Sequence, residues 1–146
     1  MRFRIRWGAQ AIRRLNESHT DVPTRFDSSR KPNFRPPVNH PELLRPETLA
    51  QFNTGKMGKS TIFMSERMLV GLNAFEPGQE HALHGHKNQD KVYHVLQGKG
   101  LFLLEDKDIE LDPGAMLVAP AGVPHGVRNT GGDRLVVLVF MAPSPV

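Results

Sequence analysis

The sequence predicts an all-β fold with antiparallel strands over its C-terminal part, preceded by an extended or disordered N-terminal segment. From Thr61 onward, short runs of β-branched and aromatic residues alternate with glycine- and proline-containing turn sequences. Strands about six residues long, with turns every 8–12 residues, are typical of a β-sandwich or barrel. The intervening loops are too short for parallel crossovers, so neighbouring strands run antiparallel.

Nine candidate strands follow one another along this part of the chain. They cover residues 61–66, 68–76, 81–86, 91–97, 100–105, 108–111, 115–120, 125–130 and 134–142. The sequences between them, such as PGQ, GKG, DPG and AGVP, contain glycines that supply positive φ and prolines that preset φ. The residues that we expect in the core are Phe75, Phe102, Leu104, Met116, Val118, Val137, Val139 and Met141.

The N-terminal segment differs from the rest in charge and in proline content. Residues 1–40 carry nine Lys/Arg and three Asp/Glu, whereas residues 41–146 carry ten and twelve. Six of the twelve prolines precede residue 50, and such a density blocks both helix continuation and sheet pairing. We therefore expect residues 1–45 to be a basic, proline-rich segment that is not a domain, and residues 46–146 to be the barrel. For residues 1–40, a solvated tail, a swapped arm and a wrongly assigned start site stay open.

The composition excludes several classes of function. There is no cysteine, which removes disulfides, thiolate nucleophiles and sulfur-ligated metals. Because the basic charge is confined to the N-terminal segment, nucleic acid is not an expected partner of the folded domain. No apolar run approaches the roughly 18 residues of a membrane span. We expect a cytoplasmic protein with no membrane partner.

Two stretches of the chain resemble the two conserved motifs of the cupins. The first is GQEHALHGHKNQDKVYHVLQG, where the residues that fit are Gly78, His84, His86 and Gly98. The second is GAMLVAPAGVPHGVRN, where the residues that fit are Gly114, Pro120, Gly122, His125 and Asn129. The resemblance covers about residues 60–142 and implies a jelly-roll barrel, also called a double-stranded β-helix. It implies no single activity, because cupins include dioxygenases, isomerases, decarboxylases, storage proteins and regulatory domains.

The resemblance also implies a metal centre. Residues i and i+2 of a strand face the same side, so His84 and His86 point in one direction, and the turn PAGVP can bring His125 beside them. Three neutral imidazoles leave open positions on a divalent ion, which is the arrangement of a catalytic site. We expect one such ion, with Fe, Mn, Zn, Ni and Cu all possible. A His-x-His pair alone is more often two polar strand residues.

Lys91 stands where the cupin motif has a glutamate ligand, and a protonated amine has no lone pair to donate. Three interpretations stay open. The ion is held by three histidines alone, as in several iron-dependent cupin dioxygenases. The side-chain oxygen of Gln89 replaces the carboxylate. In the third interpretation, Lys91 turns away from the ion, forms a salt bridge with Glu80 and leaves a weakened metal site; Glu80 has the strand parity of His84.

The remaining candidates are judged by their place in the strand pattern. Tyr93 shares the inward parity of Lys91, and both are candidate catalytic residues: a desolvated lysine can act as a base or hold an anionic substrate. Tyr93 is equally well explained as a packed ring. His94 has the opposite parity and is expected at the surface. His81 is out of phase with the histidine pair and is not expected to be a ligand.

These observations favour a metal-binding cupin that acts on or binds a small organic molecule inside the barrel. An enzyme of this kind is a metal-dependent oxidoreductase, dioxygenase-like with three histidines, or an isomerase. The alternative is a non-catalytic cupin module that binds or senses a small ligand. The resemblance to cupins also implies a homodimer, and residues 61–76 are the expected interface.

Overall fold

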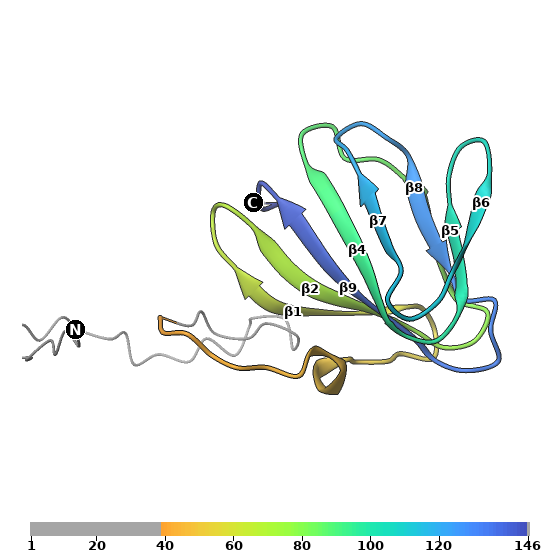
Figure 1. Ribbon diagram of the computed structural model, residues 1–146, viewed down its shortest axis with the longest axis horizontal. Helices are drawn as coiled ribbons and strands as arrows, with labels where there is room; N and C mark the ends of the chain where they lie inside the picture. The colour runs from red at the N-terminus through yellow and green to blue at the C-terminus, as the bar shows by residue number, and fades with distance from the viewer. Residues whose placement is uncertain (1–38, 146) are drawn as a thin grey trace, which may run out of the picture.

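A computed structural model describes residues 39–145, in which nine strands follow a single 3-10 helix (Figure 1). The helix η1 is Pro46–Leu49, and the strands are β1 Gly58–Met64, β2 Leu69–Phe75, β3 Glu80–His84, β4 Asp90–Gln97, β5 Gly100–Leu103, β6 Asp108–Leu111, β7 Met116–Ala119, β8 His125–Arg128 and β9 Leu135–Ala142. Each predicted strand is present, with ends that shift by up to three residues. Among residues 39–145, no helix is long and apolar enough to cross a membrane.

The strands form two antiparallel sheets. The five-stranded sheet has the order β1-β2-β9-β4-β7, and the four-stranded sheet has the order β3-β8-β5-β6. From β3 onward the chain passes repeatedly between the two sheets, and β9 returns to pair with both β2 and β4. The predicted antiparallel jelly roll is confirmed.

The core lies between the two sheets. Inward residues of neighbouring strands meet in register, as Val95 opposite Val137 and Tyr93 opposite Val139 show. The buried cluster comprises Phe75, Tyr93, Val95, Phe102, Leu111, Val127, Leu135, Val137 and Val139. Both sheets contribute to this cluster, so it holds them together and fills one part of the barrel.

Three residues predicted to be in the core lie elsewhere. Met116 and Val118 are 61% and 60% exposed, because the residue between them, Leu117, lies opposite the inward Tyr93. Since side chains alternate along a strand, the two neighbours of Leu117 point outward. Leu104 follows the end of β5 and is only half-buried, and Leu103 is buried instead.

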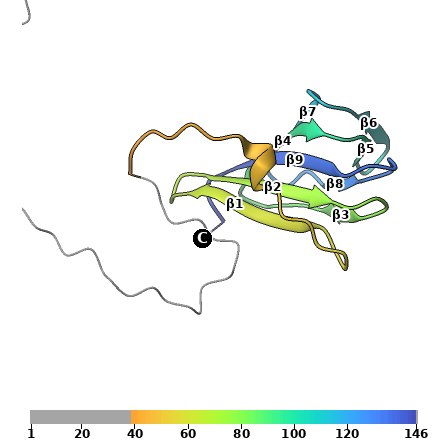
Figure 2. The same ribbon diagram turned by 90° about the horizontal axis from the view of Figure 1, so that it is seen from below.

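A second apolar cluster covers part of the outer face of the five-stranded sheet. Ile62, Leu72 and Val136 are buried there beneath residues that include Leu44 and Phe52. The Ser60 hydroxyl fixes this covering segment by donating to the Leu49 carbonyl at 2.9 Å. Figure 2 shows η1 lying against this face, over β1, β2 and β9. The predictions for residues 1–38 fall outside the described residues and stay predictions.

Asn129 of the second motif closes the end of the barrel opposite the histidines. Its side chain is fully buried, and its amide donates to the carbonyls of Phe75 and Asp133. Its backbone N–H donates to the Gln79 carbonyl, and its carbonyl accepts from Gly78. The motif asparagine therefore has a structural role.

Gly98→Ala is expected to destabilise the barrel by about 2–4 kcal/mol. Gly98 has a φ of 85°, and an added Cβ would lie 2.4 Å from the Arg134 carbonyl oxygen. The matched control is Gly132→Ala, because nothing lies within 4 Å of a Cβ there. Urea denaturation of both variants gives the free energies of unfolding. Equal values for the two variants would contradict the requirement for glycine at position 98.

Candidate metal centre

Three histidines meet at one end of the barrel, as the sequence predicts. His84 ends β3 and lies directly opposite His125, which begins β8. His86 lies two residues beyond His84, and its carbonyl accepts the Gly122 N–H at 2.8 Å. Gly122 has a φ of 81°, so a glycine suits this turn. The two motifs are thus joined by a strand pairing and by this hydrogen bond.

The three imidazoles are close enough to share one ion. One ring nitrogen from each of His84, His86 and His125 lies within 4.8 Å of the others. The ring centroids are 4.7 Å apart for His84 and His125, and 5.0 Å apart for His84 and His86. His125 is 1% exposed, and the other two histidines are half-buried.

The hydrogen bonds of the rings decide which nitrogen faces the centre. Nδ1 of His84 lies 2.8 Å from the Ala82 carbonyl, and Nδ1 of His125 lies 2.8 Å from the Val123 carbonyl. A carbonyl only accepts, so each Nδ1 carries the proton and each Nε2 carries the lone pair. The Nε2 atoms of all three histidines are buried and have no hydrogen-bond partner. Buried nitrogens without a partner need an explanation, and a metal ion supplies one.

The electrostatics keep these histidines neutral. Burial lowers the pKa of His86 to about 4, with Lys91 as the next cause. Burial also lowers the pKa of His84 and of His125, against the opposing effect of their hydrogen bonds to carbonyls. Metal binding requires neutral imidazole, so near neutral pH the ion displaces few protons.

His81 lies beside the three histidines, and the prediction that it is out of phase was wrong. The β3–β8 register shifts between His81 and His84, so that His81 faces the inward Val127. Its ring lies 3.9 Å from that of His84, centroid to centroid. Burial, followed by His84, lowers its pKa to about 3. It is not among the three histidines whose nitrogens converge, and no sequence pattern marks this irregularity.

The metal-free protein is expected to lose stability as pH falls from 6.5, the ordinary histidine pKa, towards 4. In this window the unfolded chain binds more protons than the folded chain, so the free energy of unfolding decreases by up to about 1.4 kcal/mol per pH unit for each proton. Urea denaturation across the window measures the slope. His81→Gln should flatten it, whereas His40→Gln, at an exposed position, should not. A His81→Gln variant with the full slope would contradict this account.

Lys91 and Tyr93 lie where the strand parity places them. Lys91 is 4% exposed, and its ammonium lies 4.7 Å from the centroid of the Tyr93 ring. Burial, and then Lys59, lower the pKa of Lys91 to about 8. Tyr93 is fully buried, lies 5.6 Å from the His125 ring and has a hydroxyl without a partner, and burial raises its pKa. Their catalytic roles stay predictions.

The other polar residues near the histidines in sequence lie in different surroundings. Glu80 pairs with Arg128 at 2.8 Å, both side chains being exposed, so the structure does not have the bridge to Lys91 of the third interpretation. The shifted register separates Glu80 from the parity of His84. Asp90 accepts the Ala121 N–H at 2.9 Å and so supports the turn before His125. Gln89 is half-buried in the turn before β4, and its role as an oxygen donor stays a prediction. His94 lies on the outer face, as expected, but is half-buried.

Two further polar residues on the inner face were missed by the sequence reasoning. Lys59 and Asn73 lie opposite each other on β1 and β2. Asn73 also faces Val137 of the core and is 5% exposed, and its side-chain nitrogen is buried without a partner. The first predicted strand begins at residue 61, whereas β1 begins at Gly58 and includes Lys59.

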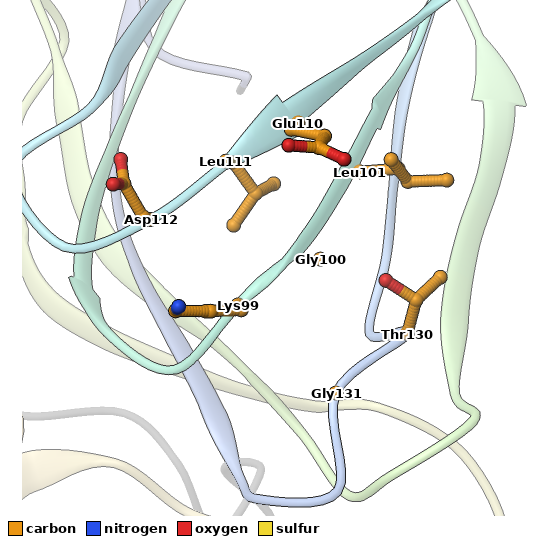
Figure 3. Close-up of a pocket in the computed structure, with 8 residues that line it drawn as sticks. All are labelled: Lys99, Gly100, Leu101, Glu110, Leu111, Asp112, Thr130 and Gly131. Carbon is orange, nitrogen blue, oxygen red and sulfur yellow. The ribbon is translucent and has the colours of Figure 1, made fainter.

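A separate hollow of about 640 Å³ lies away from these histidines. Figure 3 shows its lining, which combines Lys99 and Leu101 of one hairpin arm with Glu110 and Asp112 of the other, together with Thr130. Leu101 pairs with Arg128 at one end of β8, whereas His125 stands at the other end. The hollow is therefore separated from the histidine cluster by the length of β8.

Comparisons with known proteins agree on one family. Residues 71–141 match the family model described as "Cupin domain". The crystal structure of TT1209 from Thermus thermophilus is 42% identical, with a TM-score of 0.68 over 71% of this chain and 99% of that one. An RmlC-like cupin protein from Desulfovibrio desulfuricans is 32% identical, with a TM-score of 0.58 over 75% and 98% of the two chains.

Curated proteins give weaker similarities. The oxalate-binding protein of Thermotoga maritima is 25% identical over 67% of this chain and 87% of its own length. The uncharacterized protein MJ1618 of Methanocaldococcus jannaschii is 30% identical over 45% of this chain. The matched region spans about half of that protein, 53% of its length.

Proposed function

Because this chain belongs to the cupin superfamily, we propose that it binds one divalent metal ion through His84, His86 and His125 and offers the open positions of that ion to a small organic ligand. The observation that carries the proposal is the set of three buried Nε2 atoms without partners. Two of them belong to rings whose Nδ1–H is already held by a carbonyl. Such second contacts orient metal-binding imidazoles.

The donor set fits an open site. Three neutral nitrogen ligands suit Fe, Mn, Zn, Ni or Cu and leave positions for water and ligand. When bound, the ion supplies Lewis acidity or activates oxygen. The chain itself supplies the fixed imidazole orientation, the amino group of the buried Lys91 side chain and the Tyr93 ring beside His125.

Printed names among the relatives support a small-molecule ligand. The Thermotoga maritima relative is named for binding oxalate, and auxin-binding protein 1 of Arabidopsis thaliana is 32% identical over 75% of this chain and 64% of its own length. Both names describe those proteins. For this chain we propose the shared feature, a small organic molecule inside the barrel.

The proposed activity is that of a metal-dependent oxidoreductase, dioxygenase-like, or of an isomerase. A binding or sensing module without turnover is the second candidate. Lys91 favours the second, because the position that provides a carboxylate ligand in cupins here carries a buried cation. A weaker ion affinity matters less to a receptor than to an enzyme.

Titration of the metal-free protein with Co²⁺ tests the proposal. We expect ligand-field absorption that saturates at one ion per chain, because one set of three nitrogens converges within the described residues. An absence of saturable absorption would refute the metal site. Oxygen consumption by the iron-loaded protein with a panel of small organic acids then separates the two candidates: consumption supports the oxidoreductase, whereas binding without consumption or isomerisation supports the module.

Three finer expectations belong to the same proposal. We propose a cytoplasmic homodimer, with residues 61–76 at the interface, and a barrel that begins near residue 46. Light scattering measures the mass of the assembly, and limited proteolysis tests the boundary. Leu44 packs against the barrel, so we expect cleavage to stop before it.

A further inference from the structure

Hydrogen-bond donors gather on the wall that faces the histidine cluster. Lys91 and Tyr93 come from β4 and Asn73 from β2, and all three point to the inside of the five-stranded sheet, since they face or flank the inward Val137 and Val139. The Asn73 amide nitrogen and the Tyr93 hydroxyl are buried without partners. These side chains are 5% and 0% exposed, so both groups are shielded from bulk solvent.

On the same wall, the ammonium of Lys91 has no carboxylate partner among residues 39–145. Lys91 is 4% exposed, and the contact recorded for its ammonium is the Tyr93 ring. Within residues 39–145, the acids nearest in sequence to the histidines are engaged elsewhere: Glu80 with Arg128, and Asp90 with the Ala121 N–H. Lys59 lies near enough to lower the pKa of Lys91 and so adds to the positive potential. A buried ammonium without a counter-ion is costly, and an anionic ligand removes that cost.

We propose that Lys91 anchors the carboxylate of a small organic acid between itself and the three-histidine cluster, with Tyr93 as an additional donor. Asn73, opposite Val137, lies further along the sheet than Lys91. The replacement of the cupin glutamate by lysine is then a substrate-binding feature, in which the negative charge comes from the ligand. This inference names the class of ligand for the proposed function, and it rests on that function only for the presence of the metal ion.

The surroundings favour a small carboxylic acid over an inorganic oxyanion. Met141 lies opposite Lys91 and Val139 lies opposite Tyr93, and both are less than 8% exposed, so the carbon part of an acid finds apolar contacts beside the ammonium. The part of the barrel further from the histidines is filled by Phe75, Phe102 and Leu111. An acid of a few carbon atoms therefore fits best.

Calorimetric and spectral titration of the Co²⁺-loaded protein tests the inference. The probes are acetate, oxalate, inorganic phosphate and acetamide, the last being the neutral counterpart of acetate. We expect acetate and oxalate to bind and acetamide not to bind. Lys91→Met should keep the Co²⁺ absorption and weaken acetate binding at least about tenfold, because a charge-assisted hydrogen bond is lost. Lys99→Met is the charge-matched control, at an exposed position in the hollow of Figure 3, and should bind acetate like the wild type.

The outcomes separate this inference from the proposed function. A protein that takes up no Co²⁺ refutes the metal site, yet the same acetate titration of the metal-free protein still tests the anion site: binding that Lys91→Met weakens supports it. Equal acetate binding by Lys91→Met and the wild type overturns the inference. Equal binding of acetate and acetamide also overturns it. Tighter binding of phosphate than of either carboxylate overturns the assignment to an organic acid.

Discussion

His125→Ala is expected to lower the affinity for a divalent ion by more than about 100-fold, because the loss of a supporting hydrogen bond alone costs about 10–100-fold in metal sites. The substitution leaves two imidazoles, His84 and His86, and two ligands do not hold an ion in a wet, open site against a chelator. His125 is also the most buried of the three, with its Nδ1 fixed by the Val123 carbonyl. Competition with a chromophoric chelator near neutral pH measures the affinity.

His94→Ala is the matched control for this loss. His94 lies on β4 with its side chain on the outer face, where it pairs across strands with Met116 and Leu138. The His94→Ala variant should bind the ion with the affinity of the wild type. Circular dichroism of both variants confirms the fold. An ion affinity that His125→Ala leaves unchanged would remove this histidine from the ligand set.

Lys91→Glu is expected to tighten metal binding on the order of 100-fold, since it replaces a cation that the ion repels by an anionic oxygen donor. Lys91 occupies the glutamate position of the motif and faces the cluster, so the substitution recreates the cupin ligand set. The chelator competition used for His125→Ala gives the change. The carboxylate then competes with an organic acid, so acetate affinity should fall as metal affinity rises.

Lys91→Ala distinguishes repulsion from ligation. Removing the ammonium removes a positive charge that also lowers the pKa of His86, so metal binding should stay intact or improve. If Lys91→Ala loses the ion as completely as His125→Ala does, the lysine is part of the ligand set and the interpretation is wrong.

Much of this arrangement could be predicted from the sequence because its signals are local. Turn residues and strand lengths mark the nine strands, and strand parity places Lys91 and Tyr93 inside. The motif spacing indicates that His84 and His125 meet, and the hydrogen bond from the Gly122 N–H to the His86 carbonyl joins the two motifs next to this pair.

The remaining features depend on long-range register. The irregularity between His81 and His84 depends on the pairing of β3 with β8, so parity counted along the strand misplaced both His81 and Glu80. Met116 and Val118 were misplaced because the phase of β7 is set by β4 rather than by its own apolar pattern. Asn73 lies on the inner face, and Lys59 lies near the histidines, because β1 and β2 lie beside β9, a neighbour relation that composition does not show.

The metal content of the protein, purified without added metal, decides whether His84, His86 and His125 form a metal site. Elemental analysis should find close to one divalent transition-metal ion per chain, and His125→Ala purified in parallel should contain almost none. A wild-type protein that contains no such ion, and that takes up none of Fe, Mn, Co, Ni, Cu or Zn on dialysis, would contradict the account.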